Sequence, residues 1–280
     1  MVWSCLVSIL PGMAQTEKLT DYVNPFVGTD GYGNVYPGAQ IPFGGIQISP
    51  DTDSRFYDAA SGYKYNHLTL MGFSLTHLSG TGIPDLGDFL FIPGTGEMKL
   101  EPGTHEDPDQ GYRSRYSHDK EWASPNYYAV ELADYGVKAE MTSGVRSGMF
   151  RFTYPESDNA FIMIDMNHTL WQSCEWSNLR MINDSTITGY KLVKGWGPER
   201  HVYFTATFSK KLTGLRFVQD KKPVIYNTSR FRSSYEAWGK NLMACISFDT
   251  KAGEEVTVKT AISAVSTDGA RTVSYTHLRA

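Results

Sequence analysis

The alternation of apolar and polar residues constrains the fold of this chain most strongly. Residues 137–142, 202–208 and 256–262 alternate with a period of two, which is typical of strands with one buried and one solvated face. Residues 161–164 are apolar throughout and predict a central strand buried on both faces. No stretch shows capping residues with a 3.6-residue period, and residues 233–242 are the best short helix candidate. Many strands without crossover helices predict an all-β fold, a large antiparallel β-sandwich.

The organisation of the chain indicates one large β domain from about residue 20 to 265. Residues 19–115 are rich in Gly and Pro turns, which leaves no room for long helices, and we find no internal repeat or linker. The 26 Lys and Arg residues against 30 Asp and Glu give a net charge of −4. This balance excludes a nucleic-acid binder or a polybasic membrane-surface protein, since both need excess positive charge.

The first fourteen residues predict an export signal. Residues 2–10 are apolar, and Gly12 and Ala14 then place small residues where a signal peptidase would cut. We interpret residues 1–14 as a partial signal peptide that lacks its basic start. The run is too short to span a bilayer, so we expect no membrane span and a periplasmic or extracellular location.

Two glycine-rich stretches are candidates for ligand contact. In residues 61–88, the side chains of His77, Ser79 and Thr81 would lie on one side if the chain is extended there. The alternative is a glycine-rich loop whose polar side chains cap turns, and the residues alone leave both readings open. Residues 24–39 have glycine-rich spacing but no following helix, so a phosphate cradle is not expected.

Neither carboxylates nor histidines form a complete catalytic or metal set. Asp51 with Asp53, and Asp85 with Asp88, are close enough in sequence to suggest acid–base pairs, but such pairs in Gly/Pro loops usually form turns. Four histidines lack any metal-ligand spacing: His77, His118, His168 and His201. The residues by themselves therefore indicate an exported, aromatic-rich sandwich with one candidate ligand-facing loop region.

A run of motifs in these same regions is similar to a known family. The motifs are residues 23–29, 36–39, 41–44, 49–52, 61–63, 76–82 and 87–88, followed by 111–118, 195–196, 202–204, 262–263 and 269–270. In order and spacing, residues 19–271 resemble the amino-terminal domain of glycoside hydrolase family 92, whose members are calcium-dependent exo-acting α-mannosidases.

The resemblance implies a fold and a division of labour. Family members join an amino-terminal β-sandwich to a carboxy-terminal (α/α)6 barrel that holds the catalytic acid, the catalytic base and most of the calcium site. It implies that the parent protein hydrolyses terminal α-mannose from mannose-rich glycans with inversion. We therefore expect no catalytic or metal-binding residue in this chain, which should be inactive without its barrel partner.

The resemblance also implies substrate contacts. The family's Trp-Asp pair is replaced here by Tyr57 and Asp58, and its Gly-His-Gly-His run by residues 31–34. A Tyr ring can still stack on a sugar. The substrate-binding residues implied are Tyr57, Asp58, His77, Ser79, Gly80 and Thr81.

Two alternatives accompany this interpretation. The aromatic content, 13% of the chain, would equally suit a non-catalytic carbohydrate-binding module. Residues 272–280 depart from the family pattern, and we interpret them as a non-native tail at a truncated end, outside the predicted fold.

Overall fold

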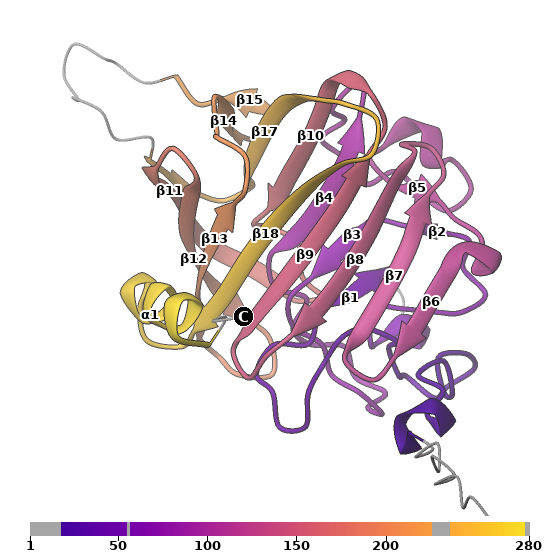
Figure 1. Ribbon diagram of the computed structural model, residues 1–280. Coiled ribbons are helices and arrows are strands. Elements are labelled where there is room, and N and C mark those ends of the chain that lie inside the picture. Colours follow the sequence, from indigo (N-terminus) through magenta and orange to yellow (C-terminus); the bar gives the residue numbers. More distant parts are fainter. Residues whose placement is uncertain (1–17, 55–56, 226–235, 278–280) are drawn as a thin grey trace, which may run out of the picture.

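The computed structural model describes residues 18–54, 57–225 and 236–277. Two antiparallel sheets pack face to face around a shared core (Figure 1), which confirms the predicted antiparallel β-sandwich. The seven-stranded sheet contains, in order, β1 (Ser49–Asp51), β3 (Gly72–Ser74), β4 (Leu90–Thr95), β10 (Ser157–Asp165), β17 (Leu242–Thr250), β14 (Gly214–Gln219) and β15 (Lys222–Pro223). The nine-stranded sheet contains β16 (Glu236–Gly239), β11 (Ser173–Asn183), β12 (Thr186–Lys194), β13 (Arg200–Phe208), β18 (Glu254–Ser263), β9 (Ser147–Tyr154), β8 (Val137–Ser143), β7 (Tyr127–Leu132) and β6 (Glu121–Ser124).

Short elements complete the fold. Strands β2 (Thr69–Leu70) and β5 (Ser114–Arg115) form a small separate sheet. The described 3-10 turns are η1 (Leu19–Tyr22), η2 (Tyr57–Ala59), η3 (Pro108–Gln110) and η4 (His118–Lys120), and the described α-helix is α1 (Thr267–His277). None of the described helices is long and apolar enough to cross a membrane. The predicted signal peptide, residues 1–14, lies outside the described residues.

The alternating stretches fold as predicted. They form β8, β13 and β18, and the apolar stretch 161–164 lies in β10, between β4 and β17. Ile162 and Ile164 point into the core between the sheets, while Phe161 and Met163 enter a second apolar cluster on the outer face. The prediction of a central strand buried on both faces is therefore confirmed.

Aromatic rings join the two sheets. Phe91 of β4 lies 4.9 Å, between ring centroids, from Phe150 of β9 and 6.5 Å from Phe204 of β13. All three side chains are fully buried. Because large aromatic side chains bury more apolar surface than other residues, these contacts fix how the sheets face each other.

The helix prediction for residues 233–242 is wrong. Residues 236–239 form β16, which pairs with β11, and β17 begins at Leu242, while 233–235 lie outside the described residues. Ala237 is buried and Trp238 exposed, so the segment follows a strand period that its pairing imposes over local helix propensity.

Helix α1 was not predicted. Gly269 and several β-branched residues make it a weak helix by propensity. The side chain of Ser266 accepts a hydrogen bond from the Gly269 backbone N–H (3.0 Å), and Ala270 and Val273 are buried where the helix packs on β18. The helix ends at His277 and so continues past Arg271, where the family resemblance ends.

Candidate functional site

The two glycine-rich stretches of the sequence meet at one end of the sandwich. The Gly80 backbone N–H donates to the Asn34 carbonyl (2.7 Å), and the Ser61 hydroxyl donates to the Val35 carbonyl (3.2 Å). Segments that are distant in the sequence thereby form one loop surface, at the lower end of the molecule in Figure 1. We call this surface the loop end.

A buried histidine–carboxylate cluster supports the loop end. The Asp51 carboxylate, at the end of β1, lies 2.7 Å from Nε2 of His77 and 2.8 Å from Nε2 of His168. The other ring nitrogen of His77, Nδ1, lies 2.7 Å from the Gln47 carbonyl oxygen. A carbonyl and a carboxylate can only accept hydrogen bonds, so the His77 ring is held between two acceptors.

The environment of Asp51 keeps its carboxyl group ionised. Burial alone would raise its pKa, but the charge of His77 and the hydrogen bond from His168 outweigh burial and hold the pKa well below its usual range. Asp51 therefore acts as a fixed counter-charge for the histidines and cannot serve as a proton donor near neutral pH.

A second buried ionic cluster surrounds Asp88. Its carboxylate lies 3.2 Å from Nζ of Lys191 and 2.5 Å from Arg200, and it accepts a hydrogen bond from the Thr76 hydroxyl (2.7 Å). Burial raises the pKa of Asp88, but the two cations outweigh that effect and hold it well below its usual range. Asp88 thus ties the chain around residues 76–88 to β12 and β13.

Both clusters predict sensitivity to acid. A carboxyl group whose pKa is lowered by folding stabilises the protein above its unfolded pKa, about 4, and loses that contribution as the pH falls below it. We expect the free energy of unfolding to fall below about pH 4, by up to about 1.4 kcal/mol per pH unit for each of Asp51 and Asp88. Denaturant titrations from pH 7 to pH 3 measure this, with Asp51→Asn reducing the slope. A free energy that does not change over this range would contradict the ionised clusters.

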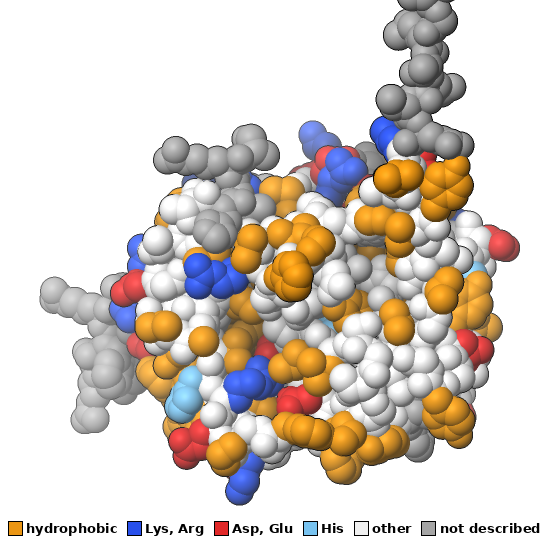
Figure 2. All heavy atoms as spheres, turned by 90° about the horizontal axis from the view of Figure 1, so that it is seen from below, with side chains coloured by type: hydrophobic (Ala, Val, Ile, Leu, Met, Phe, Trp, Pro, Cys, Tyr) orange, Lys and Arg blue, Asp and Glu red, His pale blue; other side chains and the backbone are white. Residues whose placement is uncertain are grey.

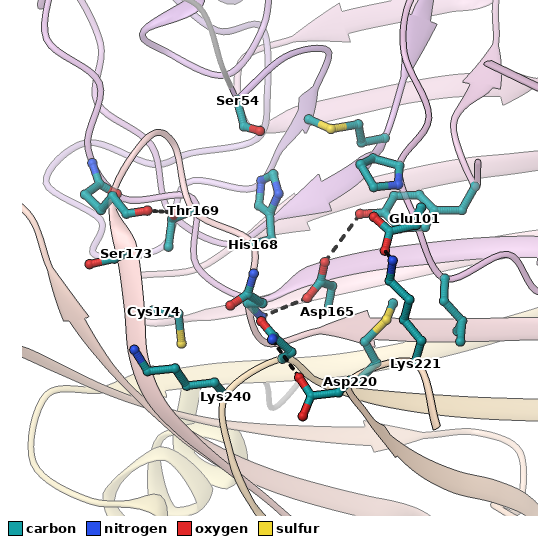
Figure 3. Close-up of a pocket in the computed structure, with 18 of the residues that line it drawn as sticks. Ser54, Glu101, Asp165, His168, Thr169, Ser173, Cys174, Asp220, Lys221 and Lys240 are labelled. Atoms are coloured by element: carbon teal, nitrogen blue, oxygen red, sulfur yellow. Dashed lines mark hydrogen bonds and ion pairs between the residues drawn. The ribbon is translucent and has the colours of Figure 1, made fainter. Parts of the chain in front are cut away.

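A cavity of about 730 Å³ opens beside His168 (Figure 3). Three carboxylates line it, and each has a partner: Glu101 pairs with Lys221 at 2.5 Å, Asp165 accepts from the Tyr112 hydroxyl at 3.3 Å, and Asp220 accepts from the Asn241 amide at 2.8 Å. Polar groups therefore surround a space large enough for a small ligand.

The chemistry of this end is that of positioning. Glycoside hydrolysis needs one carboxylic acid with a raised pKa and a second carboxylate as base. Among the described residues, every carboxyl group whose pKa departs clearly from its ordinary value has it lowered. Carboxyl groups with a lowered pKa are ionised near neutral pH, so they accept hydrogen bonds and form ion pairs but do not donate protons.

The predicted substrate-binding residues occupy different environments. Tyr57 is 58% exposed on η2, in the same turn as Asp58, while Ser79 and Gly80 are exposed on the neighbouring loop. The Thr81 hydroxyl donates to the Ile83 carbonyl and accepts from the Ile83 N–H, which is a turn-capping arrangement. Sugar contact by the predicted residues stays a prediction.

His77 does not share a side with Ser79 and Thr81. Its side chain is fully buried against Asp51, because the chain bends at Gly80 (φ +75°) and is not extended from 77 to 81. The expectation of one continuous polar row is corrected accordingly. In this structure His77 supports the loop end through its contacts with Asp51 and Gln47.

Several residues of this end carry no signal in the sequence. His77 and His168, which look isolated, share the carboxylate of Asp51 although they lie 26 and 117 residues from it. Lys191 and Arg200 lie on strands, where charged residues ordinarily face solvent. Their pairing with Asp88 accounts for their positions, and Lys191 also donates to the His168 carbonyl (2.6 Å).

The calcium implied by the family resemblance has no cluster of acidic side chains to bind it in the described residues. Calcium binds six to eight oxygen ligands, mostly carboxylates and carbonyls. In residues 18–54, 57–225 and 236–277, no group of three or more His, Cys, Asp or Glu side chains could hold a metal ion. We therefore derive no chemical step through calcium.

Comparison with known proteins identifies the class of this sandwich. The model of the glycosyl hydrolase family 92 N-terminal domain matches residues 22–263. The fold is thus that of the N-terminal domain of a glycosidase. The chain belongs to glycosyl hydrolase family 92.

Solved structures and one curated relative extend the comparison. A family GH92 α-mannosidase from Bacteroides thetaiotaomicron, solved with mannoimidazole, is 98% identical, with a TM-score of 0.90 over 92% of this chain and 34% of its own. A GH92 glycosyl hydrolase named ccman5 is 26% identical, with a TM-score of 0.75 over 90% of this chain and 33% of its own. An uncharacterized secreted glycosidase of Arthroderma benhamiae is 30% identical over 139 residues, which are 49% of this chain and 17% of that protein. The chain spans about a third of the solved enzymes that it matches.

Proposed function

We propose that this chain is the sandwich part of an exported, calcium-dependent α-mannosidase that removes terminal α-mannose from mannose-rich glycans with inversion. The observation that carries the proposal is the family match over residues 22–263, together with 98% identity to a solved α-mannosidase. The catalytic acid, the base and the calcium ligands belong to the rest of that enzyme. The sandwich supplies loops to the mannose pocket.

The surface of the loop end supports docking of a further domain. Phe43, Tyr32 and Val27 are 103%, 90% and 72% exposed. Figure 2 views this end directly and shows hydrophobic side chains spread across it. Large exposed apolar areas are uncommon on single soluble domains and usually mark an interaction surface. The proposed occupant is the catalytic barrel of the same protein.

The two buried clusters define the sandwich's part in the reaction. Asp51 with its histidines, and Asp88 with Lys191 and Arg200, hold the loops that carry Tyr57 and Ser79. A rigidly held loop loses little conformational entropy when a sugar binds, so the binding energy is retained for orienting the glycosidic bond. Export is supported by the sequence of residues 1–14 and by the secreted relative.

Replacing Tyr57 tests the pocket contribution. In a version extended to the length of the solved α-mannosidases, we expect Tyr57→Ala to lower kcat/KM for an aryl α-mannoside by about tenfold or more, because a stacking face is lost. Tyr127→Ala, on β7 of the nine-stranded sheet, is the control and should leave kcat/KM unchanged. Equal kcat/KM values for wild type and Tyr57→Ala would show that this loop does not contribute to the mannose pocket.

A further inference from the structure

Trp171 combines exposure with an unfavourable backbone conformation. Its side chain is 63% exposed at the rim of the cavity beside His168, and its φ angle is +75°. A bulky residue with positive φ is an outlier that persists only where its surroundings impose it. Such outliers concentrate at ligand-binding positions.

The neighbours of Trp171 impose this conformation. On the side preceding it, the Leu170 backbone N–H donates to the Leu86 carbonyl (3.0 Å), and Leu170 is fully buried. The His168 carbonyl accepts a hydrogen bond from the buried Lys191 ammonium (2.6 Å).

The following residue is fixed as well. The Gln172 carbonyl accepts a hydrogen bond from the Thr169 hydroxyl (2.8 Å), and its side-chain amide donates to the Pro84 carbonyl (2.9 Å). The turn is therefore held on both sides, and the indole of Trp171 projects from it.

The cavity beneath the indole offers an unused acceptor. The side-chain oxygen Oε1 of Gln172 is buried and has no hydrogen-bond partner among the residues that the structure describes. A buried acceptor without a partner costs free energy that a donor from a ligand would recover. Lys240 lines the same cavity (Figure 3), and its ammonium, which pairs with Glu175 at 3.1 Å, has further hydrogens to donate.

A second exposed indole lies on the loop between β12 and β13, next in sequence to a residue that contacts Gln172. Ser173 pairs with Lys194 at the open end of the β11–β12 ladder, and the Gln172 side chain packs against the backbone of Gly195. The next residue, Trp196, is 70% exposed.

We infer that Trp171 and the cavity beneath it form a binding subsite for a glycosyl unit, with Trp196 extending the aromatic rim. A pyranose ring presents C–H groups on one face and hydroxyls at its edge. The indole matches the first through its flat apolar face, and the polar lining of the cavity, with the Lys240 ammonium as donor, matches the second. The choice of mannose as the sugar rests on the proposed function, whereas the position of the subsite rests on this geometry.

Titration of the 280-residue chain with α-linked mannobiose, followed by isothermal calorimetry, tests the subsite. We expect a dissociation constant of roughly 1–10 mM for wild type, as befits a partly enclosed sugar. Trp171→Gly should weaken binding by about tenfold or more while keeping or raising Tm, since glycine accepts the positive φ without strain. Trp171→Phe should retain part of the affinity, and Trp122→Ala, an exposed indole on β6 at the far edge of the sheet, should retain all of it.

Two results would contradict the proposed subsite. No mannobiose binding by the wild-type chain would do so, as would binding that survives Trp171→Gly but is lost in Tyr57→Ala. Failure of the proposed function has a different signature, namely no turnover of an α-mannoside by the extended protein, whatever the chain alone binds.

Discussion

Asp88→Asn is expected to lower the free energy of unfolding by about 3–5 kcal/mol. The substitution keeps the size of the side chain but removes the negative charge that pairs with both Lys191 and Arg200. Lys191 is fully buried, so its charge would remain in the protein interior without a counter-charge. Chemical denaturation at neutral pH, monitored by tryptophan fluorescence, measures the loss.

Asp109→Asn is the matched control. Asp109 also pairs with an arginine, Arg115, at 2.8 Å, but its side chain is 73% exposed. Exposed ion pairs contribute little to stability, so this variant should unfold like wild type. If both variants lost the same free energy of unfolding, burial would not determine how much the Asp88 cluster stabilises the protein.

Gly62→Ala should disrupt the Asp51 cluster and lower stability by about 3 kcal/mol or more. Gly62 has φ +85°, and a Cβ atom built on it would lie 2.2 Å from Oδ1 of Asp51 and 3.2 Å from Nε2 of His77. The carboxylate would have to move, which would separate it from the His77 ring.

Gly80→Ala isolates the backbone contribution. Gly80 has a similar φ of +75°, but a Cβ there meets nothing within 4 Å. This variant should lose only about 1–2 kcal/mol, the ordinary cost of a left-handed alanine. Equal losses of stability for the two variants in the same denaturation experiment would show that the Asp51 contact does not stabilise the protein.

The strands were predictable where one face is exposed to solvent and the other is buried. Stretches such as 137–142 and 256–262 alternate clearly because their outer faces meet solvent. Strands β1 and β3 gave no such signal, since they are three residues long and buried throughout. Helix α1 was missed because burial of Ala270 and Val273 stabilises it more than its own propensity does.

The site was only partly predictable for a related reason. Turn chemistry located the loop end, since Gly62 and Gly80 do adopt positive φ. The ionic clusters beneath it depend on contacts between residues more than a hundred positions apart, such as Asp51 with His168. Lys191 lies on the buried face of a strand, where an alternating pattern predicts an apolar residue.

The central claim, that this chain positions substrate for a catalytic domain elsewhere in the same protein, is tested most directly by turnover. The purified 280-residue chain and a version extended to the length of the solved α-mannosidases are incubated with an aryl α-mannoside and calcium. The account predicts mannose release by the extended protein and none above background by the chain alone, because glycosidic cleavage needs a proton donor and a base on opposite faces of the sugar. Turnover by the chain alone would contradict the account, and its loss in Asp85→Asn, with the fold retained, would place the catalytic acid inside the sandwich.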